Sequence, residues 1–66
     1  MTATLSFYCR EIGEKQYFEY FANGNVISEQ DFHEGLADYV LTSITYYVTH
    51  AQIDKHTTQH VYHFTF

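Results

Sequence analysis

The stretch from Ser28 to Ala51 constrains the fold more than any other part of the chain, because its apolar residues cover an unusually wide arc of a helical wheel. The arc spans roughly 220°, whereas a helix packed on a single core normally shows an apolar arc of about 100° or more. Its members are Phe32, Leu36, Ala37, Tyr39, Val40, Leu41, Ile44, Tyr46, Tyr47, Val48 and Ala51. One small sheet in a chain of 66 residues cannot bury all of this surface. The pattern predicts one long amphipathic helix that also contacts another protein chain.

The residues around Ser28 are typical of a helix start. A serine at the N-cap accepts a hydrogen bond from a backbone N–H of the first turn, and an acidic residue, Asp31, follows Ser28 three positions later. Ile27 precedes the cap and is placed to contact Phe32 across the first turn. We therefore expect the helix to begin directly after Ser28.

Three other segments alternate between apolar and polar residues. Ala3–Ile12, Tyr17–Ala22 and Thr58–Phe66 show the period of two that is typical of half-buried strands. The polar connector Gly13–Gln16 has the length of a hairpin loop. The alternation places two sets of residues toward the helix, namely Leu5, Phe7 and Cys9 in the first strand and Phe18, Tyr20 and Ala22 in the second.

These elements predict a single α+β domain over residues 1–66, in which a mainly antiparallel sheet packs on one long amphipathic helix in the order β-β-α-β. The sheet has three strands, or four if Asn25–Ile27 pairs with Tyr17–Ala22 after the Asn23-Gly24 turn. A right-handed crossover would set the last strand beside the first and parallel to the second.

The charge of the chain favours a basic protein as the partner. Eight acidic residues against three basic ones give a formal net charge of -5, which repels nucleic-acid phosphates. Asp31, Glu34 and Asp38 repeat at i, i+3 and i+7 and so form one row of carboxylates on the predicted helix. Such a row is either a solvated helix face or a surface that docks on a basic groove, and both interpretations stay open.

The aromatic content also indicates protein binding. Seven tyrosines and six phenylalanines exceed what so small a core needs, and tyrosine is enriched at protein interfaces. We expect contacts with a partner from Tyr8, Tyr17 and Phe21 on the outer face of the sheet. Tyr39 and Tyr46, which flank the sheet-facing arc of the predicted helix, are the other aromatic candidates.

The histidines are the main candidates for chemistry. His56, His60 and His63 have i, i+4, i+7 spacing, which on a helix would gather three imidazoles as metal ligands. The β-branched and aromatic residues around them favour a strand instead, where His60 and His63 point to opposite faces. Cys9 lies among inward residues of the first strand, which is typical of a core thiol. We therefore expect no catalytic residue, metal or cofactor, and a protein that is not an enzyme.

The sequence also suggests where such a protein works. It has a single cysteine, no basic start followed by a long apolar run, and no stretch that approaches the ~18 apolar residues of a membrane span. We expect a cytoplasmic protein that contacts neither a membrane nor nucleic acid directly.

In size, acidity and aromatic content the whole chain resembles the small proteins with which phages and mobile elements inhibit bacterial defence complexes, anti-CRISPR proteins among them. The resemblance implies an inhibitor that binds a basic, nucleic-acid-handling complex. The alternative from a different class is a structural homodimer whose wide apolar arc contacts a second copy. Metal binding by the C-terminal histidines is a third alternative.

Overall fold

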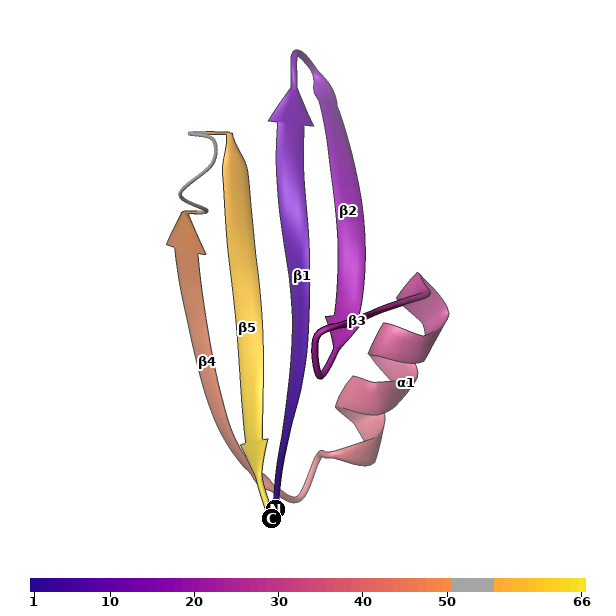
Figure 1. The fold of residues 1–66 in the computed structure, drawn as a ribbon, viewed down its shortest axis with the longest axis vertical. Helices are drawn as coiled ribbons and strands as arrows, with labels where there is room; N and C mark the ends of the chain where they lie inside the picture. The colour runs from indigo at the N-terminus through magenta and orange to yellow at the C-terminus, as the bar shows by residue number, and fades with distance from the viewer. Residues whose placement is uncertain (51–55) are drawn as a thin grey trace.

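The computed structural model describes residues 1–50 and 56–66 as one antiparallel sheet with a short helix on one face (Figure 1). Its elements in chain order are β1 (Thr2–Ile12), β2 (Lys15–Ala22), β3 (Asn25–Ile27), α1 (Glu29–Asp38), β4 (Ser43–His50) and β5 (Thr57–Thr65). The strands lie in the order β3-β2-β1-β5-β4, and every neighbouring pair is antiparallel. The predicted α+β class is confirmed, but the sheet has five strands and the helix is much shorter than predicted.

β1 and β2 form the predicted hairpin. Gly13 turns the chain with a φ of +64°, a conformation that glycine adopts without a side-chain clash. Leu5 pairs with Ala22 and Phe7 pairs with Tyr20, so these residues share the face on which α1 packs. The predicted inward side of both strands is confirmed.

The short strand β3 exists, which answers the question that the sequence left open. Asn23 (φ 51°) and Gly24 (φ 85°) form the turn before it. Asn23 also fastens this turn to β1, because its backbone N–H donates to the Thr4 carbonyl at 2.8 Å and its Oδ1 accepts from the Thr4 N–H at 2.9 Å. Asn23 thus has two roles: it adopts the positive φ of the turn after β2, and it links that turn to β1.

β5 lies beside β1, as predicted, although α1 leads into β4 and not directly into β5. It pairs with β1 along its whole length, and because β2 and β5 are both antiparallel to β1, β5 runs parallel to β2. The backbone N–H of Phe66 donates to the Met1 carbonyl at 2.8 Å, so the two chain ends lie side by side (Figure 1).

The predicted helix from Ser28 to Ala51 is wrong in its length. Its start is confirmed, since the Ser28 Oγ accepts a hydrogen bond from the Asp31 N–H at 3.1 Å. However, α1 ends at Asp38 after ten residues. Ala51, the predicted end, lies outside the described residues.

A turn and a strand follow α1. The N–H and the hydroxyl of Thr42 both donate to the Tyr39 carbonyl, at 3.1 and 2.8 Å, and this turn leads into β4. Within Ser43–His50 every residue except the two terminal ones is β-branched or aromatic, a composition that fits a pleated strand. The second half of the apolar arc therefore belongs to β4, and the surplus helix surface inferred from the wheel does not exist.

Phe32 joins α1 to three strands. Its side chain is 2% exposed, and its ring lies 5.5 Å from that of Phe7 in β1, 5.0 Å from Tyr20 in β2 and 6.1 Å from Tyr62 in β5, measured between ring centroids. Gly35, one turn later, lets the helix approach β1, because a Cβ there would stand only 3.0 Å from Leu5 Cδ1. Ala3, Leu5 and Phe64 complete the buried cluster below the helix.

The helix covers only part of the sheet. α1 packs on β1 and β2, and in Figure 1 it lies beside β2, on the side away from β4. We call the face that carries α1 the helix side and the opposite face the open face. Among residues 1–50 and 56–66, no second layer covers the open face or the helix side of β4.

We predict that Phe32→Ala lowers the free energy of unfolding by about 3 to 5 kcal/mol. The substitution removes the α1 ring that contacts β1, β2 and β5. Leu41→Ala is the control, since Leu41 is 96% exposed and its truncation should change the stability by less than about 0.5 kcal/mol. Urea denaturation followed by circular dichroism measures both. Equal losses for the two variants would contradict this account of the core.

Candidate protein-binding surfaces

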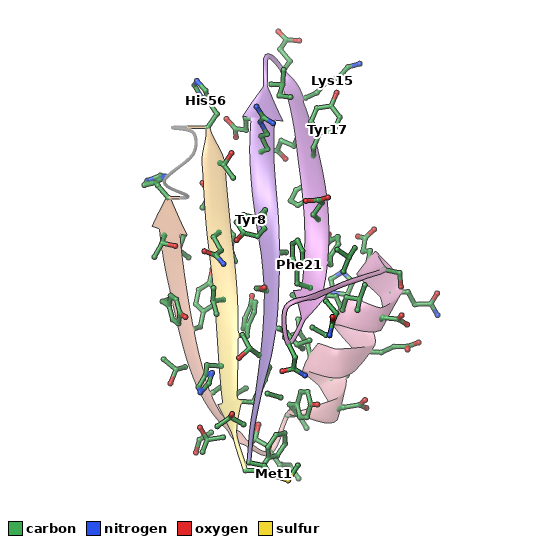
Figure 2. The ribbon with its side chains drawn as sticks, in the orientation of Figure 1. Met1, Tyr8, Lys15, Tyr17, Phe21 and His56 are labelled. Atoms are coloured by element: carbon green, nitrogen blue, oxygen red, sulfur yellow. The ribbon has the colours of Figure 1, made fainter. Side chains whose placement is uncertain are left out.

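The eight predicted partner-binding residues do not form one patch. Asp31, Glu34 and Asp38 lie on α1, whereas Tyr8, Tyr17 and Phe21 lie on the open face of the β1/β2 hairpin (Figure 2). Tyr39 and Tyr46 were predicted to lie on one helix. In the structure, Tyr39 is the C-cap of α1 and Tyr46 lies in β4. A flat partner that touches the carboxylates therefore cannot also touch the open face.

The first candidate surface is the acidic face of α1, which we define as Asp31, Glu34 and Asp38. All three side chains are exposed. Gln30 Nε2 donates to Glu34 Oε1 at 3.2 Å, and His33 lies 3.7 Å from Glu29, so the neighbouring polar contacts stay within the helix. No lysine or arginine occurs in α1. The acidic face thus has no lysine or arginine on its own helix to pair with.

Asp38 is at an unfavourable position for the helix itself. The C-terminal end of a helix carries the negative end of the helix dipole, so an acidic side chain there is destabilising and a basic one is stabilising. The last turn of α1 contains Asp38 and no basic residue. Asp31, in contrast, lies in the first turn, where the dipole favours a carboxylate.

The second candidate surface is the aromatic part of the open face. Tyr8 and Phe21 form an edge-to-face pair with ring centroids 5.4 Å apart, and both rings are half-buried. Tyr17 is exposed on the same face, nearer the turn that joins β1 and β2 (Figure 2). The predicted placement of these three residues on the outer face of the sheet is confirmed.

Tyr39 and Tyr46 are placed differently from the prediction. The Tyr39 ring packs 4.7 Å from that of Phe64 and 5.0 Å from that of Phe66, at the margin of the core. The Tyr46 ring is tilted against that of Tyr62, with ring centroids 4.7 Å apart, and the Tyr46 hydroxyl lies 2.6 Å from His60 Nδ1. Both rings have partners within the chain, so they do not flank an uncovered helix arc.

The third candidate surface, which was not predicted from the sequence, is the helix side of β4. Ile44 and Val48 are each 47% exposed there, and Tyr46 lies between them. A sequence pattern for this strand exists, because the apolar residues Ile44, Tyr46 and Val48 alternate with Thr45, Tyr47 and Thr49. The same residues also fit the period of a helix, since apolar residues are frequent from Phe32 to Val48.

Burial affects two tyrosine hydroxyls on the helix side. Desolvation raises the pKa of Tyr20 above its ordinary value, and the nearby Glu29 carboxylate and Cys9 raise it further. Desolvation also raises the pKa of Tyr62, with Tyr46 as a second cause. Both shifts favour the protonated hydroxyl, which is the form that donates hydrogen bonds.

The histidines are dispersed. His60 stacks on Phe7 with ring centroids 4.3 Å apart on the helix side, whereas His63 Nδ1 lies 3.1 Å from Thr4 Oγ1 on the open face. The prediction that a strand separates these two histidines is confirmed. Within residues 1–50 and 56–66, the structure gathers no three His, Cys, Asp or Glu side chains that could hold a metal ion.

Comparison of the chain with models of known protein families, with curated proteins and with solved structures finds no match. In the described part of the chain, no helix has the length and apolar character needed to cross a membrane.

We predict opposite stability effects for two lysine substitutions at the ends of α1. Asp38→Lys should raise the free energy of unfolding by about 0.3 to 1 kcal/mol, because it replaces repulsion from the helix dipole with attraction. It also creates a favourable i, i+4 pair with Glu34. Asp31→Lys should lower the free energy of unfolding by a similar amount. Urea denaturation at low salt measures both, and changes of the same sign would show that the dipole does not govern these positions.

Proposed function

We propose that this chain is a small protein-binding module, not an enzyme, which docks the acidic face of α1 on the basic surface of a nucleic-acid-handling protein. By occupying a surface that would otherwise hold phosphates, it acts as an inhibitor, in the manner that the resemblance to anti-CRISPR proteins implies. The partner supplies the positive charge, and the chain supplies a compact folded row of carboxylates.

One observation carries this proposal: Asp31, Glu34 and Asp38 are all exposed on a helix that has no lysine or arginine. Asp38 is the informative member, because the helix dipole disfavours a carboxylate at that end. A charge that lowers helix stability needs a reason outside the helix, and recognition of a basic partner provides one.

The carboxylates direct docking rather than copy DNA in full. Between Asp31 and Asp38 the helix rises ~10.5 Å, over which a DNA duplex would present about six phosphates. The acidic face offers three carboxylates over that distance. Its contribution is therefore to steer the partner and fix the register, an effect that weakens as ionic strength rises.

Charge reversal on α1 tests the proposal. The triple variant Asp31→Lys, Glu34→Lys, Asp38→Lys should stay folded, since exposed charges contribute little to stability, but should lose the partner. Both chains are used as bait in a bacterial lysate, and the captured proteins are identified by mass spectrometry. The wild type should retain basic, nucleic-acid-handling proteins that added salt or added duplex DNA releases.

A matched control separates the position of the charges from their number. The variant Glu11→Lys, Glu14→Lys, Glu19→Lys changes the net charge by the same amount on the β1/β2 hairpin and should keep the partner. If the α1 variant binds as well as the wild type at physiological salt, the acidic face is only a solvated surface. The aromatic open face with Tyr8, Tyr17, Phe21 and His63 would then be the next surface to test.

A further inference from the structure

We propose that β4 pairs antiparallel with β4 of a second copy of this chain, so that two five-stranded sheets join into one continuous ten-stranded sheet. This dimer differs from the one predicted from the helical wheel, because its contact is a strand edge and not a helix arc. It is independent of the proposed function, since α1 packs on β1 and β2, near the edge of the sheet opposite to β4 (Figure 1).

The hydrogen-bonding pattern identifies the free groups of β4. Phe66 donates its N–H to the Met1 carbonyl, and Glu11 donates to the His56 carbonyl, so even-numbered β5 residues bond to β1. Because the pattern alternates in antiparallel sheets, odd-numbered β5 residues bond to β4. Their partners in β4 are also odd-numbered, as in the pair of Tyr47 and Val61.

The even-numbered residues of β4 therefore direct their backbone groups outward. Ile44, Tyr46, Val48 and His50 present N–H and C=O groups along the outer edge of the sheet, and no strand among the described residues pairs with them. An antiparallel copy of the same edge offers the complementary donors and acceptors at the same spacing. A row of this kind is the surface to which another strand adds most readily.

The charge distribution favours a second copy as the occupant. β4 and β5 contain no Asp, Glu, Lys or Arg, whereas the chain as a whole has a formal net charge of -5 with its histidines counted as neutral. The acidic residues of the described part lie in the β1/β2 hairpin and in α1. Two copies can thus join at β4 while their like charges stay at the far edges.

The two edges of the sheet differ in their protection. At the β2 edge, β3 covers Tyr20 to Ala22, and the rest of β2 carries Lys15 and Glu19, which discourage strand addition. β4 is eight residues long and has neither a charge nor a proline. Natural proteins rarely leave such an edge unpaired, because it promotes aggregation.

Symmetry fixes the arrangement of the dimer. Antiparallel pairing of identical strands places a two-fold axis perpendicular to the sheet, so both α1 helices lie on the same side. Residues with outward groups must face each other, so the axis passes through a residue position. The longest overlap of two β4 strands then centres the axis on Tyr46 or on Tyr47. With the axis on Tyr46, Ile44 faces Val48 of the second copy; with the axis on Tyr47, Tyr46 faces Val48. Either register joins the exposed helix sides of β4 into one apolar strip between the helices.

Sedimentation velocity of the full chain tests the pairing. At high micromolar concentration the wild type should sediment at twice the mass of the 7.8 kDa monomer. Val48→Lys should sediment as a monomer, because it places a charged side chain opposite Ile44 or Tyr46 of the second copy, and a lysine on an edge strand opposes strand addition. Val26→Lys is the matched control: it makes the same substitution at an exposed position of the opposite edge strand and should remain dimeric.

Two further variants keep the test decisive. Ile44→Lys repeats the edge substitution at the other end of β4, and circular dichroism confirms that each variant is folded. The α1 charge-reversal variant should remain a dimer, which separates this proposal from the proposed function. A wild type that sediments as a monomer, a dimer that both β4 variants leave intact, or a dimer that Val26→Lys dissociates would overturn the proposal.

Discussion

The packing of Phe32 against Phe7, Tyr20 and Tyr62 holds this fold together, because it is where the helix meets three strands. A chain of 66 residues buries little surface, and among the described residues only Ala3, Leu5, Phe32, Val61 and Phe64 are buried apolar side chains. One short helix cannot cover five strands. The exposed apolar residues of β4 and of the open face are a direct consequence of that limit.

Local patterns in the sequence predicted the local structure well. The hairpin, the inward sides of its strands and the Ser28 cap all depend on neighbouring residues, and all are confirmed. The position of the last strand beside β1, which was predicted from the handedness of the crossover, is confirmed as well. The end of the helix could not be predicted in the same way. Apolar residues are so frequent between Phe32 and Val48 that a period of 3.6 and a period of 2 both fit. The β-branched and aromatic composition of Ser43–His50 was the better guide.

The error in the helix had unequal effects on the predicted surfaces. Asp31, Glu34 and Asp38 lie within the true helix, so their shared exposure survives the correction. Tyr46 was placed by the phase of a helix that does not exist there, and in the structure it belongs to β4. Tyr39 lies at the end of the helix, where its ring packs on Phe64. The strand edge itself was not predictable without the sheet order, because only that order makes β4 an outer strand.

Residue-resolved amide hydrogen exchange tests the central claim, that Ser43–His50 is an outer strand with one bonded and one open side. In dilute solution the odd-numbered amides, including those of Thr45 and Tyr47, should be protected by β5, while those of Ile44, Tyr46 and Val48 exchange quickly. At high protein concentration the even-numbered amides should also become protected. Continuous protection from Phe32 to His50 in dilute solution would indicate the long helix instead and would contradict the account.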